Sequence, residues 1–306
     1  LYPDVDRTVH VEPAAGDMTV RPAAMDQVTS SGAMDMTVRS TAEPEQIDTD
    51  MDDVAGDYFV LKGVKYKNKQ CLSENTGEAQ VYLVERNGEE YVLKIYYPTF
   101  NVNKKMLQTI YNFKFEMIVS LLDYGKVYVD GKNRNYELME YLRGGSMAEY
   151  HLNGDIDKFR RIALQAAAAL AYCHSNNILH KDVKPSNLFF RDKEHTEVVL
   201  GDFGISSMLE NDGKVHQTTQ ARPPIYAAPE MYSDVIDGMV EVTPAADFYS
   251  LGITLLYIWL GGNPLSSNER VMMRQKSEGR LPRLNELPER VKMIIQGMTV
   301  VNPLNR

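Results

Sequence analysis

Short apolar stretches alternate with polar turns in the part of the chain that follows residue 57. Residues 58–61, 81–84 and 91–96 are rich in aromatic and β-branched side chains, which is typical of strands. Asn87 and Gly88 separate the last two stretches, and this dipeptide strongly favours a tight hairpin turn because both residues tolerate a positive φ. The pattern therefore predicts a β-rich region that contains a hairpin.

After residue 141 the spacing of apolar residues changes to that of helices. In an alanine-rich segment that Asp155 can cap, the recurring apolar positions are Phe159, Ile162, Ala166, Ala169 and Cys173. Strands come first along the chain and helices second, so we expect an α+β fold with two lobes. The expected boundaries are a small β-rich N-lobe at residues 58–140 and a larger α-helical C-lobe at residues 141–306.

Residues 248–260 are apolar on nearly all sides of a helix, which indicates a buried helix. A helix that spans a membrane needs about 20 such residues. This run is shorter, is preceded by Asp247, and ends at the sequence Gly261-Gly262-Asn263-Pro264. We therefore expect a core helix, and no membrane segment in this chain.

The first 57 residues differ in composition from the rest. Large aliphatic residues are few and no period of 2 or 3.6 persists, so the segment cannot bury enough apolar surface to fold, and we expect a disordered tail or linker. It holds 13 acidic and three basic residues, a net charge of −10, whereas the remainder holds 29 acidic and 30 basic residues. The acidity thus belongs to the tail, and no basic patch indicates binding to nucleic acid.

Three copies of the pattern Asp-x-Thr-Val followed by a basic residue occur in this acidic tail. Their threonines, Thr8, Thr19 and Thr37, are candidate phosphorylation sites. A phosphate on them could bind the arginines of a partner that reads phosphothreonine, such as a forkhead-associated domain. The alternative is a duplicated linker without such a role.

Cys71 and Cys173 are the two cysteines of the chain, and they form neither a disulfide framework nor a metal-binding spacing. A reducing compartment is therefore the simplest expectation, and we expect a cytoplasmic protein.

Two polar motifs in the C-lobe combine the side chains that phosphoryl transfer needs. They are the run His180-Lys181-Asp182-Val183-Lys184-Pro185-Ser186-Asn187 and the triplet Asp202-Phe203-Gly204. The reaction requires an acceptor for the proton of the attacking hydroxyl, oxygen ligands for magnesium, and a cation near the transferred phosphate. The candidates for these parts, in that order, are Asp182, Asn187 with Asp202, and Lys184.

These motifs resemble the catalytic loop and the metal-binding turn of the protein kinase family, and Lys184-Pro185 resembles its serine/threonine members. The triplet Ala228-Pro229-Glu230 is similar to the end of the family's activation segment. The resemblance covers residues 58–306, and compact bacterial members of the eukaryotic-like group look most similar. It implies a bilobal kinase fold, ATP and Mg²⁺ as cofactors, and a protein substrate. It also implies that a final helix of the family lies beyond Arg306.

The resemblance further implies which residues bind the nucleotide. Lys94 corresponds to the strand lysine that contacts the α- and β-phosphates, and it joins Asp182 and Lys184 as a catalytic residue. Gly77 is the remaining glycine of the loop that covers the phosphates. The residues expected around adenine are Val81, Val92, Met139, Glu140, Leu142 and Leu188. Among them Met139 is the gatekeeper, while Glu140 and Leu142 would bond the ring through backbone groups.

The phosphate side of this site departs from the family pattern. Family members orient the strand lysine with a glutamate from a helix, but no Asp or Glu occurs between Glu90 and Glu116. Met106 or Gln108 stands near the expected position. We therefore expect Lys94 to lack its usual partner.

The activation segment departs from the pattern as well. Lys181 stands where many members have an arginine, and a lysine cannot form the bidentate bond to a phosphate that arginine forms. Pro223 replaces a frequent threonine. Thr218 and Thr219 are candidate activation sites, with solvated loop hydroxyls as the alternative. Arg306 is expected to pair with Glu230, in a structural role.

Three functional hypotheses follow from these observations. The first is an active serine/threonine protein kinase, which could phosphorylate its own tail or activation loop. The second is a pseudokinase that binds ATP and acts as a signalling scaffold, as the departures from the family pattern allow. The third is an enzyme of the same fold that phosphorylates a small molecule, against which the activation-segment motif argues.

Overall fold

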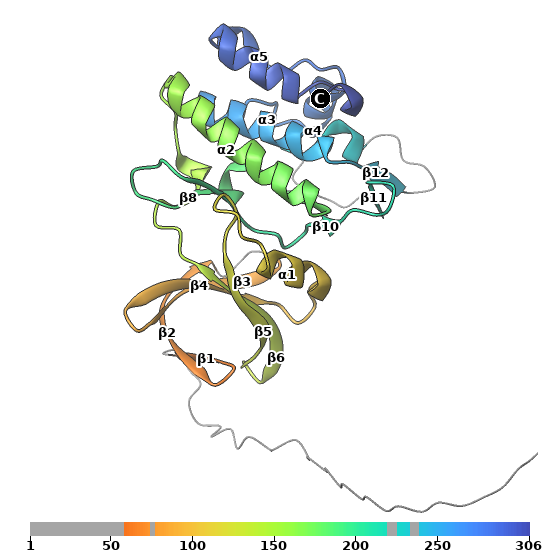
Figure 1. Cartoon of the computed structure of the whole chain (residues 1–306). Coiled ribbons are helices and arrows are strands. Elements are labelled where there is room, and N and C mark those ends of the chain that lie inside the picture. Colours follow the sequence, from red (N-terminus) through yellow and green to blue (C-terminus); the bar gives the residue numbers. More distant parts are fainter. Residues whose placement is uncertain (1–57, 74–76, 219–224, 233–238) are drawn as a thin grey trace, which may run out of the picture. The chain divides into compact units, whose positions relative to one another are not determined.

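The computed structural model describes residues 58–73, 77–218, 225–232 and 239–306. The predicted tail with its threonine repeats lies outside the described residues. Within the described part, a β-rich N-lobe is followed along the chain by a helical C-lobe (Figure 1). The predicted α+β fold class is confirmed.

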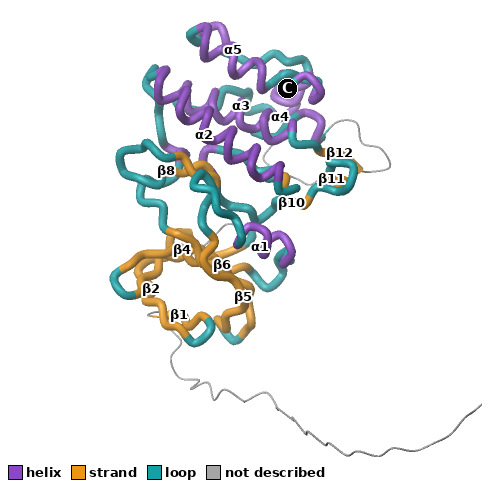
Figure 2. Tube along the Cα trace, viewed as in Figure 1, coloured by secondary structure: helices purple, strands orange, loops and turns teal. Residues whose placement is uncertain are grey.

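The N-lobe is built on an antiparallel sheet with the strand order β1-β2-β3-β4-β6-β5 (Figure 2). The strands are β1 (Tyr58–Leu61), β2 (Val64–Ser73), β3 (Ala79–Arg86), β4 (Glu89–Tyr96), β5 (Leu121–Val129) and β6 (Lys132–Glu140). The three predicted strand stretches lie in β1, β3 and β4. Asn87 and Gly88 join β3 to β4 with φ values of 54° and 81°, so the predicted hairpin is confirmed.

Alternation along the strands gives this sheet two different faces. One face forms a small apolar core from Leu61, Tyr66, Val84, Leu93, Ile95, Val127, Tyr136 and Leu138. Lys94 and Tyr96 alternate with the core residues of β4 and therefore point to the opposite face. The face that carries Lys94 is thus separate from the apolar core of the lobe.

Helix α1 (Lys104–Tyr111) contributes to the main core of the protein and not to the small core of the sheet. It begins after Asn103, whose side chain accepts a hydrogen bond from the Met106 N–H at 3.2 Å. Its buried residues are Met106, Leu107 and Ile110. The helix is therefore held by apolar contacts.

The helices of the C-lobe are α2 (Ile156–Ser175), α3 (Ala245–Leu260), α4 (Glu269–Ser277) and α5 (Glu289–Met298). The side chain of Asp155 caps α2 by accepting the N–H of Lys158 at 3.0 Å, and all five predicted apolar positions of this helix are buried. The predicted core helix is α3, which is buried on nearly all sides and ends at Gly261 with a φ of 70°. Both helix predictions are confirmed.

Short strands and single helical turns carry the loops of the C-lobe. The strands pair as β7 (Ile178–Leu179) with β10 (Ser207–Met208), β8 (Leu188–Phe190) with β9 (Val198–Leu200), and β11 (Val215–Thr218) with β12 (Met239–Val242). The turns are η1 (Met147–Glu149), η2 (Pro185–Asn187), η3 (Pro229–Met231), η4 (Leu284–Glu286) and η5 (Pro303–Asn305). The predicted catalytic motifs lie in the loops between these elements.

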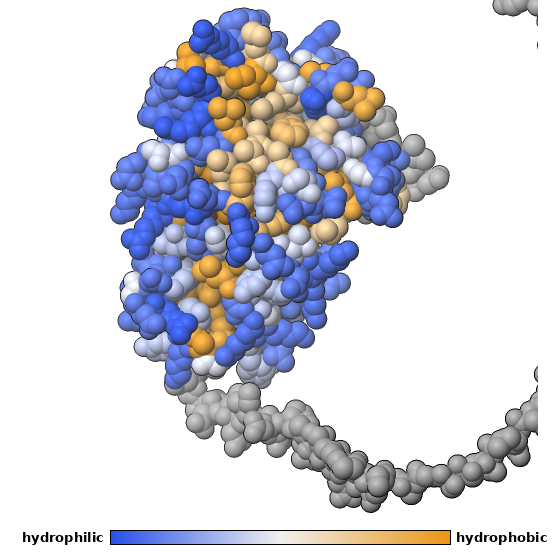
Figure 3. Space-filling model, viewed as in Figure 1, coloured by the Kyte–Doolittle hydropathy of each residue, from blue (hydrophilic) through white to orange (hydrophobic). Residues whose placement is uncertain are grey.

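Figure 3 shows apolar colours over the helical part and in a smaller patch over the sheet, while much of the remaining visible face is hydrophilic. Leu164 of α2 is an exposed apolar side chain, with 64% of its area exposed. None of the helices in the described ranges combines the length and the apolar character needed to cross a bilayer.

Candidate functional site

The loop from His180 to Asn187 is fixed at its start by Asp247 of helix α3. The buried carboxylate of Asp247 accepts the backbone N–H of His180 at 2.9 Å and that of Lys181 at 2.7 Å. Nε2 of His174 lies 2.8 Å from the same carboxylate. Charge-assisted bonds from backbone donors are strong and directional, so this carboxylate sets the path of the loop. Sequence reasoning missed this anchor; the available signal was an acidic residue at the start of an apolar helix.

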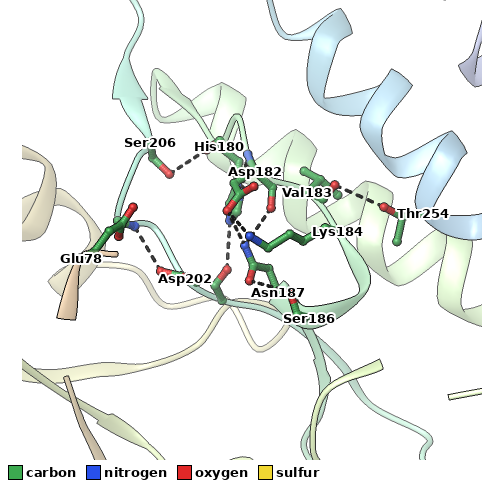
Figure 4. A network of polar contacts seen from close by, with 12 residues as sticks. Glu78, His180, Asp182, Val183, Lys184, Ser186, Asn187, Asp202, Ser206 and Thr254 are labelled. Atoms are coloured by element: carbon green, nitrogen blue, oxygen red, sulfur yellow. Dashed lines mark hydrogen bonds and ion pairs between the residues drawn. The ribbon is translucent and has the colours of Figure 1, made fainter. Parts of the chain in front are cut away.

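Three of the predicted residues converge inside this loop (Figure 4). Nζ of Lys184 donates to Oδ2 of Asp182 at 2.7 Å. Nδ2 of Asn187 donates to the same oxygen at 3.0 Å and to the Asp182 carbonyl at 2.8 Å. Asn187 is buried, whereas about a quarter of the Asp182 and Lys184 side chains is exposed, at 24% and 28%. The loop therefore presents a carboxylate and an ammonium group to solvent on a buried amide support.

Asp202 approaches this loop from the turn that follows β9 (Figure 4). Its Oδ1 accepts a hydrogen bond from Nζ of Lys94 at 2.7 Å. Removal from water would raise the pKa of Asp202, but the ammonium of Lys94 outweighs this effect and holds the pKa below its usual value. The structure thus joins Lys94 of the N-lobe to the Asp202-Phe203-Gly204 turn of the C-lobe as an ion pair.

Backbone geometry at the two motifs is constrained. Lys181 and Asp202 have φ values of 67° and 59°, a region that side chains other than glycine occupy at a cost. At Gly204 an added Cβ would lie 2.4 Å from Oε2 of Glu78 and 3.1 Å from Nζ of Lys94. A larger residue in this turn would therefore displace the carboxylate of Glu78 and crowd the ammonium of Lys94.

The donor set fits a magnesium ion shared with a nucleotide. Mg²⁺ prefers oxygen ligands and is commonly bound by one or two side chains together with phosphates. Since Nδ2 of Asn187 donates to Asp182, its Oδ1 lies on the other side of the amide, where it can act as an oxygen ligand with the carboxylate of Asp202. No group of three His, Cys, Asp or Glu side chains within the described ranges could hold a metal on its own.

Lys94 is buried and lies beside more than one carboxylate. Besides Asp202, Oε2 of Glu78 lies 3.7 Å from its Nζ. Burial alone would lower the pKa of Lys94, but the charges of Asp202 and Glu137 raise it above its usual value. The pKa of Glu78 is raised by its removal from water, although Lys94 opposes this effect. Glu78 and Glu137 were both missed in the sequence, since neither follows a family motif.

Helix α1 supplies none of these carboxylates, as the sequence predicts. The side chain of Met106 is buried in the core, and Oε1 of Gln108 accepts a hydrogen bond from the Tyr124 hydroxyl at 3.2 Å. Glu116 is exposed in a turn beyond the helix. The carboxylates described near Lys94 therefore come from elements other than α1.

The residues predicted around adenine meet in the sheet and in β8. In the strand ladders Val81 is paired with Lys94 and Val92 with Met139, so these side chains are neighbours on one face. Leu188 is buried in β8. The structure therefore brings together predicted apolar residues of three neighbouring strands, β3, β4 and β6.

The two predicted backbone contacts to adenine differ in detail. The Glu140 N–H donates to the Ser120 carbonyl at 3.1 Å. The backbone group of Glu140 that remains for the expected bond to adenine is therefore its carbonyl. The Glu140 side chain accepts from Arg191 at 2.7 Å, which fixes the end of β6. Leu142 follows this strand and is buried. At Gly77 an added Cβ would meet no atom within 4 Å, so no described contact requires a glycine there.

Strand β11 of the activation segment contacts both a neighbouring strand and the catalytic loop. Strand β11 pairs with β12, from Val215 opposite Val242 to Thr218 opposite Met239. Nζ of Lys181 donates to Oε1 of Gln217 at 2.9 Å. The lysine that replaces the family's arginine thus binds a neutral amide of β11. Thr219 and Pro223 lie outside the described residues.

The expected pair of Glu230 and Arg306 is present. Nη2 of Arg306 donates to Oε2 of Glu230 at 2.8 Å, and Nη1 donates to the other carboxylate oxygen. The arginine side chain is fully buried and also donates to backbone carbonyls of residues 300 and 301. This bidentate geometry supports the predicted structural role.

Comparisons with known proteins agree with this geometry. A sequence model of the protein kinase domain matches residues 75–306. A carbon catabolite-derepressing protein kinase of Candida tropicalis is 36% identical over 173 residues, which cover 56% of this chain and 25% of that protein. The serine/threonine protein kinase OSK3 of Oryza sativa subsp. indica is 33% identical over 175 residues, which cover 56% of this chain and 33% of that protein. The chain thus spans a quarter to a third of the length of these relatives.

A solved structure gives the same fold. The crystal structure of Rad53 1-466 in complex with AMP-PNP has a TM-score of 0.62 and 23% sequence identity, and the match covers 79% of this chain and 62% of that chain. The kinase-domain match extends over most of the chain and includes both motifs of the candidate site. This chain belongs to the protein kinase family.

Proposed function

We propose that this chain is an ATP-dependent serine/threonine protein kinase, which transfers the γ-phosphoryl group of ATP to hydroxyl groups of proteins. The main support is the convergence of Asp182, Lys184 and Asn187 on one loop, with Asp202 and Lys94 joined beside it. Phosphoryl transfer depends mainly on positioning and charge stabilisation, and these five side chains provide both.

Each side chain would have a distinct task. As the bond from the substrate oxygen to phosphorus forms and the bond to ADP breaks, the Asp182 carboxylate would accept the hydroxyl proton. Lys184, which is 2.7 Å from that carboxylate, would offset the negative charge on the transferred group. Lys94 would bind the α- and β-phosphates. Mg²⁺, held by Asn187 and Asp202, would neutralise phosphate oxygens when bound.

A small pocket, with room for little more than a water molecule, lies beside the catalytic loop. The pocket is lined by Lys181, Asp182, Val183, Lys184, Tyr226, Ala227 and Ser250. It therefore lies between Asp182 and the end of the activation segment, the side from which a protein substrate would approach. For the nucleotide, we propose that Gly77, Val81, Val92, Met139, Glu140, Leu142 and Leu188 form its binding surface.

The decisive experiment compares the wild-type protein with Asp182→Asn in γ-labelled ATP and magnesium. We expect labelling of protein by the wild type and a fall of about 10²–10⁴-fold in the variant, because a general base typically contributes that much. ATP binding should remain, since Asp182 would act on the substrate hydroxyl. Asp157→Asn, on the exposed first turn of α2, makes the same chemical change away from the site and should keep full activity.

A pseudokinase scaffold is the second candidate, favoured by the absence of a carboxylate on helix α1. Binding of magnesium and ATP without any transfer would support it and would contradict the first proposal. Transfer to small metabolites alone would instead support a kinase of small molecules.

We further propose that the kinase phosphorylates its own threonines. The candidates are Thr8, Thr19 and Thr37 of an acidic tail at residues 1–57, and Thr218 and Thr219 of the activation segment. Phosphorylated tail repeats would bind a partner that reads phosphothreonine, in the cytoplasm. Mass spectrometry of the active protein would test this proposal, and tail peptides that remain unmodified would contradict it.

A further inference from the structure

We propose that Glu137, acting through Tyr96, holds Lys94 in its phosphate-binding position, in place of the helix carboxylate that this chain lacks. Glu137 would thus be a positioning residue for the nucleotide phosphates. The inference rests on the proposed nucleotide-binding function and concerns a residue outside the catalytic motifs.

Three carboxylates surround Lys94, and they differ in whether they are free to remain beside it when nucleotide and metal bind. Asp202 contacts Lys94 at 2.7 Å, but in the proposed function the same carboxylate binds the metal. Glu78 lies 3.7 Å away, at the start of the phosphate-covering region, and 28% of its side chain is exposed. Glu137 is 7% exposed and is paired with Lys94 in the ladder between β4 and β6. Of the three, Glu137 is the one fixed within the sheet.

Tyr96 connects Glu137 to Lys94. Its hydroxyl donates to Oε1 of Glu137 at 2.5 Å, and the ammonium of Lys94 lies 5.0 Å from the centre of its ring. Tyr96 is 1% exposed, so both contacts are shielded from water. A phenol that donates to a carboxylate has a more electron-rich ring, which strengthens its attraction for a cation. The carboxylate therefore acts on Lys94 by its charge and through the ring.

The backbone beneath this arrangement is also fixed. The buried side chain of Arg134 donates to the carbonyl of Tyr96 at 2.8 Å and to that of Ile95 at 3.0 Å. The same guanidinium donates to Oε1 of Gln80 at 2.8 Å. Side chains of β3 and β6 thus hold the backbone at the end of β4, from which the ring of Tyr96 extends.

The charges of the group are consistent with this arrangement. Burial, reinforced by the nearby carboxylate of Glu137, raises the pKa of Tyr96 well above its usual value, so the phenol remains the hydrogen-bond donor. Burial also raises the pKa of Glu137, while Lys94 and the Tyr96 hydroxyl oppose that rise. A buried carboxylate of this kind is stabilised by the cation that it positions.

A double-mutant cycle tests the inference by binding, without any need for phosphoryl transfer. Calorimetry would measure the affinities for adenosine and for ADP with magnesium in the wild type, Glu137→Gln, Lys94→Met and the double variant. We expect Glu137→Gln to weaken ADP about tenfold and to leave adenosine unchanged, because Lys94 contacts phosphates only. In the Lys94→Met background the same change should have no further effect on ADP.

Two further variants serve as comparisons. Tyr96→Phe removes the hydroxyl but keeps the ring, so it should weaken ADP binding by a smaller factor than Glu137→Gln. Glu85→Gln, at a solvent-accessible ion pair with Lys69 between β2 and β3, makes the same carboxylate-to-amide change and should alter neither affinity. If Glu137→Gln fails to fold, Tyr96→Phe and Glu137→Asp keep the packing and enter the same cycle.

Three results would contradict the inference. Equal losses for adenosine and ADP would make Glu137 a residue of structural stability alone. Additive effects in the cycle would mean that Glu137 does not act through Lys94. A wild type that binds neither ligand would overturn the proposed function together with the inference, whereas the first two results would leave the proposed function intact.

Discussion

The catalytic loop and the surroundings of Lys94 fix charged side chains in different ways. In the loop, Asp182, Lys184 and Asn187 lie within six consecutive positions, and one buried carboxylate, Asp247, anchors the backbone before them. Around Lys94 the charged partners come from the bend before β3, from strand β6 and from the turn after β9. The first arrangement is local in sequence, whereas the second is assembled from distant segments.

This difference explains why the catalytic loop follows the family pattern whereas the surroundings of Lys94 do not. A contiguous loop needs each residue at its own place, because its spacing sets its geometry. A lysine in a sheet can be surrounded by carboxylates from any neighbouring strand, since cross-strand pairs bring side chains close together. The loss of one carboxylate on a helix can therefore be compensated on a strand.

The largest expected effect concerns the anchor of the loop. Replacing Asp247 by alanine leaves the backbone N–H groups of His180 and Lys181 buried without their acceptor, and we expect the free energy of unfolding to fall by roughly 2–5 kcal/mol. Urea denaturation of both proteins would measure this loss. Asp247→Asn retains one acceptor and should lose less. If Asp247→Ala lowers the free energy of unfolding by less than about 0.5 kcal/mol, Asp247 is not the main anchor of the loop.

A second buried lysine, Lys276, lies beside a backbone carbonyl, whereas Lys94 lies beside carboxylates. Nζ of Lys276 in α4 donates to the carbonyl of Ala227 at 2.7 Å, and burial lowers the pKa of Lys276 from 10.5 to about 7. Between these two pH values the unfolded chain binds more protons than the folded chain, so this lysine makes stability rise with pH across that window.

Lys276→Met should remove this contribution. Between pH 8 and 10 we expect the free energy of unfolding to rise less steeply with pH in the variant than in the wild type. The two slopes should differ by about 1.4 kcal/mol per pH unit, which is the linkage of one proton. Urea denaturation at several pH values would measure both slopes, with Lys193→Met, at an exposed position, as the control. Identical slopes for wild type and Lys276→Met would show that the amine stays charged, as that of Lys94 does beside its carboxylates.

The smallest expected effect concerns the activation segment, where the Lys181 ammonium donates to the neutral side chain of Gln217 in β11. Gln217→Ala removes the acceptor of the Lys181 ammonium, and we expect the transfer rate to fall about fivefold, corresponding to about 1 kcal/mol. Gln217→Glu keeps an acceptor and adds a charge, so it should retain the activity. Steady-state kinetics would compare the three proteins. Equal rates in all of them would mean that the contact between Lys181 and Gln217 does not help to position the segment.

Much of the fold was predictable from local patterns. The hairpin at Asn87-Gly88, the capped helix after Asp155 and the buried helix α3 each follow from a turn preference or from apolar spacing. The catalytic residues were identifiable for a similar reason, since their spacing along one loop is itself the signal. The pairs between distant segments, such as Lys181 with Gln217 and Lys94 with Glu78, were not predictable. Their formation depends on strand register and loop path.

The sequence by itself determined which chemical groups are available: the carboxylate, amide and ammonium groups of the catalytic loop, and a helix without a carboxylate. The position of Glu137 opposite Lys94 in the sheet is a result of the tertiary structure, because the two residues are 43 positions apart in the sequence. The tertiary structure also decided that Asp247 anchors the catalytic loop from a separate helix. The spacing of residues along one loop is a local property of the sequence. Burial and the approach of charged side chains depend instead on how distant segments pack.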